Sequence, residues 1–242
     1  MNKLLGLSVA LLSGAISATA VADVNTQEYQ IRFTEQAPMI DGSGTDTAWL
    51  EADTLTQFTF PWRPAVAPAT EFKALWDAEA VYFRYRVSDD NIAIGTDPKR
   101  AILDSDRAEI FLAKDKALST YYTMEIDPKA RVFSAKAAYD SENKKIGSLD
   151  SSWKWPGLVA KSSTMDKGYI VEGKIPLSTL TSLELWQDSQ KTELLCALMR
   201  AEFTQKPDGS LDMGWMTWID PNTAKPNFHN PYTFGSCKLT KK

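Results

Sequence analysis

The chain has 242 residues, and 31 acidic against 27 basic side chains give it a formal net charge of −4. This balance supplies no basic surface for a nucleic acid, so a neutral or cationic partner is expected instead. After the first 22 residues, no run reaches the ~18 consecutive apolar residues that a membrane helix needs, and no membrane partner is expected.

Residues 1–22 have the pattern of a secretory signal peptide. Lys3 gives a short positive start, residues 4–16 are apolar, and Ala20-Val21-Ala22 forms an A-x-A cleavage site before Asp23. No cysteine lies there to carry a lipid. We expect a cleaved signal, one mature domain over residues 23–242, and a periplasmic or secreted location.

The mature chain is dominated by short runs in which apolar and polar residues alternate. The first clear run places Val81, Phe83, Tyr85 and Val87 on one face of a strand. Further strands are predicted within residues 106–114, 121–128, 168–177, 194–203 and 215–220. The stretch 176–183 predicts one short helical turn. This pattern is typical of an all-β protein, and we expect a single antiparallel β-sandwich with few short helices.

Several charged residues lie in the middle of these strands, where a plain solvent face would favour Thr, Ser or Lys. They predict a polar floor on one sheet that could bind the hydroxyl groups of a sugar; its members are Arg84, Glu109, Glu125, Arg200 and Glu202. The alternative is a solvated face with ordinary cross-strand ion pairs. The side on which Arg200 projects is ambiguous, because both faces of residues 194–203 are apolar.

The eight tryptophans of the chain fall into different contexts. Trp49 follows an Asp-Gly turn and is expected to be a structural packing anchor. Trp62 lies between prolines in a loop, Trp155 lies in a second loop, and Trp218 lies near the C-terminus. Indole rings stack on the apolar face of a pyranose, so we expect these three residues to bind carbohydrate. Alternatively, such loop residues fold back as lids on the core.

Cys196 and Cys237 both lie in strand-like segments of a chain expected to be exported, which predicts a disulfide that holds the last strand. The alternative is two separate buried thiols. Two cysteines and one histidine do not make a closed zinc site, and no metal site is predicted. The acidic turns at residues 88–91 and 104–106 could hold calcium, although they lack the spacing of an EF-hand.

The residues offer little for catalysis. There is no G-x-S-x-G motif, and the single histidine, His229, has no recognisable nucleophile nearby. Glu109 with Glu202 forms a candidate glycosidase pair, but carboxylates are abundant in any chain with this many acidic residues. The chain has no C-x-x-C-H motif for covalent haem. A non-covalent haem remains an alternative.

Seven segments, taken together and in order, resemble the carbohydrate-binding module family 9-like proteins, a branch of the DOMON-like β-sandwiches. They cover residues 39–49, 72–92, 104–115, 121–135, 168–180, 198–203 and 218–239. The resemblance implies a sandwich whose concave face and bordering loops bind sugar, in modules often attached to xylanases and other glycosidases. It also implies that the F-H-x-P-x-x-F-G ending, Phe228 to Gly235, is structural, so His229 is expected to stabilise the fold. Ser134 departs from the family, in which an acidic residue is frequent at that place.

These observations favour an exported protein that binds oligo- or polysaccharide and supports carbohydrate catabolism, without a cofactor. Two alternatives remain open: a glycoside hydrolase acting on O-glycosyl bonds, and a DOMON-like protein that binds haem or another cofactor.

Overall fold

The computed structural model describes residues 27–187 and 192–241, so the predicted signal peptide lies outside the described residues. The first strands are β1 (Glu28–Phe33), β2 (Thr70–Trp76), β3 (Ala80–Ser88), β4 (Arg107–Ala113), β5 (Tyr121–Ile126) and β6 (Val132–Asp140). The later ones are β7 (Lys145–Asp150), β8 (Val159–Met165), β9 (Gly168–Pro176), β10 (Glu193–Gln205), β11 (Leu211–Thr217) and β12 (Gly235–Thr240). Three short helices are present: η1 (Thr47–Leu50), α1 (Leu177–Ser182) and η2 (Pro231–Thr233). The all-β prediction and the helical turn after Pro176 are confirmed.

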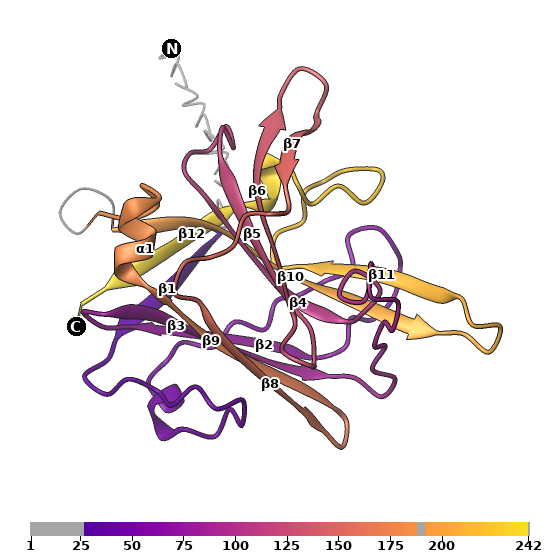
Figure 1. The fold of residues 1–242 in the computed structure, drawn as a ribbon, viewed down its shortest axis with the longest axis horizontal. Helices are drawn as coiled ribbons and strands as arrows, with labels where there is room; N and C mark the ends of the chain where they lie inside the picture. Colours follow the sequence, from indigo (N-terminus) through magenta and orange to yellow (C-terminus); the bar gives the residue numbers. More distant parts are fainter. Residues whose placement is uncertain (1–26, 188–191, 242) are drawn as a thin grey trace, which may run out of the picture.

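The strands form one continuous hydrogen-bonded sheet that folds over on itself. Their order is β7-β6-β5-β4-β10-β12-β1-β2-β3-β9-β8, and β11 pairs with β10. In Figure 1, β2, β3, β8 and β9 run together in the lower half of the view, and β6 and β7 lie above them. The sheet therefore makes the two layers of a sandwich, and β12 and β1 connect them.

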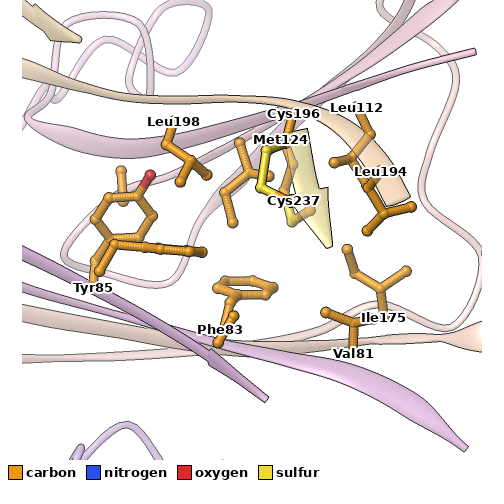
Figure 2. Close-up of a cluster of buried hydrophobic side chains, with 14 of the residues drawn as sticks. Val81, Phe83, Tyr85, Leu112, Met124, Ile175, Leu194, Cys196, Leu198 and Cys237 are labelled. Atoms are coloured by element: carbon orange, nitrogen blue, oxygen red, sulfur yellow. A yellow bond between two sulfur atoms is a disulfide. The ribbon is translucent and has the colours of Figure 1, made fainter. Parts of the chain in front are cut away.

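The core fills the space between the two layers. Figure 2 shows Leu112, Met124 and Leu198 of one layer facing Phe83 and Ile175 of the other. The alternation of residues 81–87 is also confirmed, because their odd-numbered side chains are buried in this core. The even-numbered side chains of β3 therefore lie on the outer face of their layer.

The first strand departs from the predicted antiparallel arrangement. β1 pairs in parallel with β12 and with β2, whereas the other strand pairs are antiparallel. β1 therefore lies between the last strand and the second strand.

A loop on the outer face of the β3–β9 layer is held by one buried carboxylate. The two oxygens of Glu172 accept hydrogen bonds from the Nε1 of Trp49 at 2.9 Å and from the backbone nitrogen of Gly42 at 2.8 Å. The Trp49 side chain is fully buried, and its indole hydrogen bond is satisfied as buried polar groups require.

The C-terminal segment, residues 218–234, crosses the outer face of the opposite layer. The Nδ1 of His229 lies 3.0 Å from the hydroxyl of Tyr121, and its ring centroid is 4.9 Å from that of Phe111. Burial, and secondarily the charge of Arg107, lowers the pKa of His229 to about 4. His229 is therefore a neutral ring held against strands β4 and β5.

The predicted disulfide between Cys196 and Cys237 is present, with a Cα–Cα distance of 6.0 Å. It links β10 to β12 inside the core, as Figure 2 shows. The bridge closes a sequence separation of 41 residues.

We expect the double substitution Cys196→Ala, Cys237→Ala to lower the free energy of unfolding by about 4 kcal/mol, because a loop of this length loses that constraint in the unfolded chain. The melting temperature should fall by roughly 10 °C, as measured by calorimetry. Reduction of the wild-type protein is the control and should give a similar fall. An unchanged melting temperature in both experiments would contradict a structural disulfide.

His229→Ala should lower the free energy of unfolding by about 1–3 kcal/mol, because it removes a partly buried hydrogen-bonding ring. The wild-type folded state disfavours protonation of His229, so its stability should decline as the pH falls from about 6.5 to 4. The variant should lose this part of the decline in a urea-unfolding series. Tyr121→Phe, which removes only the partner hydroxyl, is the matched control and should keep the pH dependence.

Candidate functional site

A charged cluster lies on the outer face of the β4–β5 layer. Glu109 of β4 and Glu125 of β5 are cross-strand neighbours, and Arg107 serves both. The Nε of Arg107 lies 2.6 Å from the Glu125 carboxylate and 3.1 Å from that of Glu109. Its hydrogen bond is directed to Glu125. One guanidinium thus faces two carboxyl groups.

Among the described residues, Glu109 is the member of this cluster whose carboxyl group has no hydrogen bond. It is completely buried, and neither of its carboxyl oxygens has a hydrogen-bond partner among the described residues. Burial, followed by the charge of Glu125, raises its pKa to about 8. Burial also raises the pKa of Glu125. Glu109 is therefore mainly protonated at neutral pH, which lowers the cost of burying it.

Aromatic rings from the C-terminal segment cover this face. The Phe228 ring centroid is 4.9 Å from that of His229 and 6.4 Å from that of Phe111. The Phe228 ring centroid is also 6.2 Å from that of Trp215 and 6.4 Å from that of Trp62. The aromatic cover therefore extends from β4 to the loop of Trp62.

Trp62 lies at the edge of this cover and is partly exposed. Its Nε1 donates to the hydroxyl of Thr223 at 3.0 Å, which fixes the indole against the C-terminal segment. The next residue, Arg63, forms an ion pair with Asp212 of β11 at 3.4 Å, and both side chains are partly exposed. We call Trp62, Arg63, Asp212 and Thr223 the Trp62 rim. It combines an aromatic face with accessible hydrogen-bonding groups.

A second charged group lies between the layers, at one end of the core. The Arg200 guanidinium is completely buried and pairs with Asp89 at 3.3 Å and with Glu202. It also donates to the hydroxyl of Thr70 and the carbonyl of Ser88. A cleft of about 460 Å³ opens beside Asp89 and Glu202. Arg200 projects inward, which settles the ambiguity of its strand.

The two acidic turns suspected of binding calcium meet at this place. Carboxylate oxygens of Asp89, Asp106 and Glu202 all lie within 4.8 Å of one another. However, Arg200 already neutralises two of them, and Asp106 accepts hydrogen bonds from the backbone nitrogens of Ala93 and Phe203. Burial raises the pKa of Asp106 to about 7. This set of carboxylates suits an internal guanidinium better than a metal ion.

Arg84 occupies a third position, on the outer face of the other layer. It donates to the carbonyl of Gly44 at 2.7 Å, pairs with Glu71, and lies over the ring of Trp49. The expected common floor of Arg84, Glu109 and Arg200 is therefore not formed. Strand parity placed the first two on the outer side of their strands, but those strands belong to opposite layers.

The predicted glycosidase pair is also separated. Glu109 lies on the outer face of β4, whereas Glu202 shares the inward parity of Leu198 on β10. The two carboxyl groups therefore flank opposite sides of one sheet and do not face a common substrate.

The remaining tryptophans lie closer to the core than the loop positions implied. Trp155 is buried, packs against Tyr122, and donates its Nε1 hydrogen to the carbonyl of Thr123 at 2.8 Å. Trp218 is partly buried against the same core. Both follow the alternative in which loop tryptophans fold back as lids.

Sequence reasoning did not select Trp215, Arg63 or Asp212. Trp215 could have been found from the strand pattern, because it lies on the same face of the strand as Met213 and Thr217. The pairing of Arg63 with Asp212 depends on a single bridge between Thr59 and Thr217, which no local pattern reveals.

Two curated proteins resemble this chain in sequence. Exoglucanase XynX of Acetivibrio thermocellus is 31% identical over 209 residues, and Endo-1,4-beta-xylanase A of Thermoanaerobacterium saccharolyticum is 28% identical over 207 residues. Each match covers 85% of this chain but 16% of the relative. The chain therefore corresponds to a small part of each enzyme.

Solved structures show the same fold. Two are of a carbohydrate binding module family 9 from Caldicellulosiruptor kristjanssonii, in complex with glucose and with cellotriose. Each is 18% identical, with TM-scores of 0.60 and 0.61. They cover 88% and 89% of this chain, and the matches span 96% and 94% of those chains. A Bacteroides uniformis protein matches with a TM-score of 0.63 at 13% identity, over 88% of this chain and 99% of its own.

The family comparison covers most of the described chain. The profile of the carbohydrate family 9 binding domain-like family matches residues 40–242, from the loop held by Glu172 through the last strand. This chain belongs to the carbohydrate family 9 binding domain-like family.

Proposed function

We propose that this chain is an exported carbohydrate-binding protein that captures neutral β-1,4-linked gluco- or xylo-oligosaccharides and supports carbohydrate catabolism. Family membership supports the ligand class. A glucose and a cellotriose complex of fold neighbours, and the xylanase and exoglucanase relatives, support the choice of sugars. The predicted signal peptide and the disulfide support export to an oxidising compartment. Among residues 27–187 and 192–241, no helix is long and apolar enough to cross a membrane.

The geometry of the Trp62 rim is the observation that supports the proposed location of the binding site. A pyranose presents an apolar face that stacks on an aromatic ring, and a rim of hydroxyls that need donors and acceptors. Trp62 supplies the ring, held in place by Phe228 and Thr223. Arg63 and Asp212 supply a donor and an acceptor that are both partly exposed.

The buried charged residues have a supporting role in this proposal. Glu109 and Arg200 are completely inaccessible, and Arg84 is occupied by Glu71 and Gly44. Their hydrogen bonds hold the strands and loops around the binding surface, so substitution should affect folding before it affects sugar affinity.

Trp62→Ala should weaken binding of cellotriose or xylotriose about tenfold or more, because the loss of one stacking ring is comparable with the 1.4 kcal/mol that corresponds to one decade in affinity. Titration calorimetry measures the change. The melting temperature should remain close to that of the wild type, since Trp62 lies at the edge of the structure.

Arg200→Ala is the contrasting variant. It leaves the buried carboxylates of Asp89 and Glu202 without their cation, so the free energy of unfolding should fall by about 3–5 kcal/mol. Unchanged affinity in Trp62→Ala, with lost affinity in an Arg200→Ala protein that still folds, would place the sugar at the inner cluster instead.

Glu109→Gln tests whether the outer cluster is structural. The raised pKa of Glu109 means that the folded wild-type protein holds a proton that the unfolded chain releases, so stability should fall as the pH rises from about 4.5 to 8. The stability of the variant relative to wild type should therefore increase across this range in urea unfolding. Sugar affinity should stay within about twofold; a tenfold loss would show direct contact with the ligand.

A further inference from the structure

A cleft of about 530 Å³ opens where the first residues of β1, β10 and β12 meet the η2 turn. This volume is within the range of about 300–1,000 Å³ that small-molecule sites occupy. Leu195, Tyr232 and Phe234 are among the residues that line it. No residue of the Trp62 rim lines this cleft, so it is a separate feature of the surface.

Tyr232 is an exposed aromatic ring on a fixed support. The residue is 76% exposed. Its backbone nitrogen donates to the side chain of Asn230 at 2.9 Å, and the next residue, Thr233, is buried. Phe234 packs edge-on against Tyr121, with ring centroids 6.1 Å apart. The ring is thus presented to solvent by a turn that is anchored on both sides, which lowers the entropy cost of stacking a ligand on it.

The strand register places hydrogen-bonding groups beside this apolar side. Ser236 of β12 pairs with Glu28 of β1 and with Leu195 of β10. The Ser236 hydroxyl donates to the Glu193 carboxylate at 2.6 Å. Two carboxylates and a hydroxyl therefore lie on the same surface as the apolar residues.

Lys116 supplies a donor from the turn between β4 and β5. It is exposed, lines the cleft, and forms no ion pair within the part of the chain that the structure describes. Glu28 and Glu193 also line the cleft, and Glu28 forms an ion pair with Lys238 at 2.5 Å. The cleft therefore carries both signs of charge, so it selects neither an anion nor a cation. A neutral ligand with an apolar face and several hydroxyls uses all of these groups.

We propose that this cleft is a second carbohydrate site, which stacks one face of a neutral gluco- or xylo-oligosaccharide on Tyr232 and binds its hydroxyls through Glu28, Glu193 and Lys116. The inference depends on the proposed sugar-binding function for its ligand class. It adds a second point of attachment, which increases the apparent affinity for a long polysaccharide that reaches both sites.

The test is titration calorimetry with cellotriose and xylotriose on wild type, Tyr232→Ala, Trp62→Ala and the double variant. The wild type should bind two sugars per chain, and each single variant should retain one of the two. Tyr232→Ala should lose about tenfold in affinity at its site, while Tyr232→Phe, which keeps the ring, should stay within about twofold of wild type. Leu50→Ala, which removes another highly exposed apolar side chain outside both sites, is the matched control and should behave as wild type.

The outcomes separate the two proposals. Tyr232→Ala isotherms that equal those of wild type, with binding lost in Trp62→Ala, would overturn the second site and leave the proposed function intact. Loss of sugar binding in Tyr232→Ala, with unchanged binding in Trp62→Ala, would support the cleft as a binding site and exclude the Trp62 rim as one. No binding of either sugar by the wild type would overturn both.

Discussion

The Arg200 guanidinium has no contact with solvent, and a charge in that position must be neutralised by its neighbours. The carboxylates come from Asp89, just after β3, and from Glu202 on the same strand as Arg200. Thr70 of β2 adds a hydroxyl. These contacts join strands of both layers at one end of the sandwich. The apolar core joins the layers over the rest of β10, and the Cys196–Cys237 bridge fixes this strand to its neighbour β12. One long strand therefore organises the interior.

Local alternation predicted the fold class well. The runs around Phe83 and Ile110 contain apolar residues at every second position, and the structure buries those positions between the layers. Alternation did not predict strands β7 and β8, because neither has a buried face. β7 is exposed along its whole length. β1 escaped because its role depends on β12, a strand at the other end of the described chain.

The candidate site was less predictable, because strand parity fixes only the side of a strand and not the layer to which the strand belongs. Arg84 and Glu109 each lie on the expected side, yet on opposite surfaces of the molecule. The pairing of the 88–91 and 104–106 turns with Glu202 likewise depends on tertiary contacts. The disulfide was an easier prediction, since two cysteines in strand-like segments of a chain expected to be exported favour a disulfide.

Polar groups in this protein divide into two classes with different chemical prospects. Glu109 and Arg200 are far from water, and their charges are balanced by protonation or by ion pairs. Arg63, Asp212, Glu28 and Lys116 remain accessible next to aromatic rings. The accessible groups can exchange water for a ligand at low free-energy cost. The buried groups instead hold the strands and loops on which the accessible groups lie.

The parallel position of β1 has a consequence for the order of assembly on the ribosome. During synthesis β1 is made before β12, so the edge of β1 that pairs with β12 has no partner until the last strand has been made. During this interval the strand has an unpaired edge of the kind that recruits other chains. The sheet therefore cannot close between its two layers before the last strand has been synthesised.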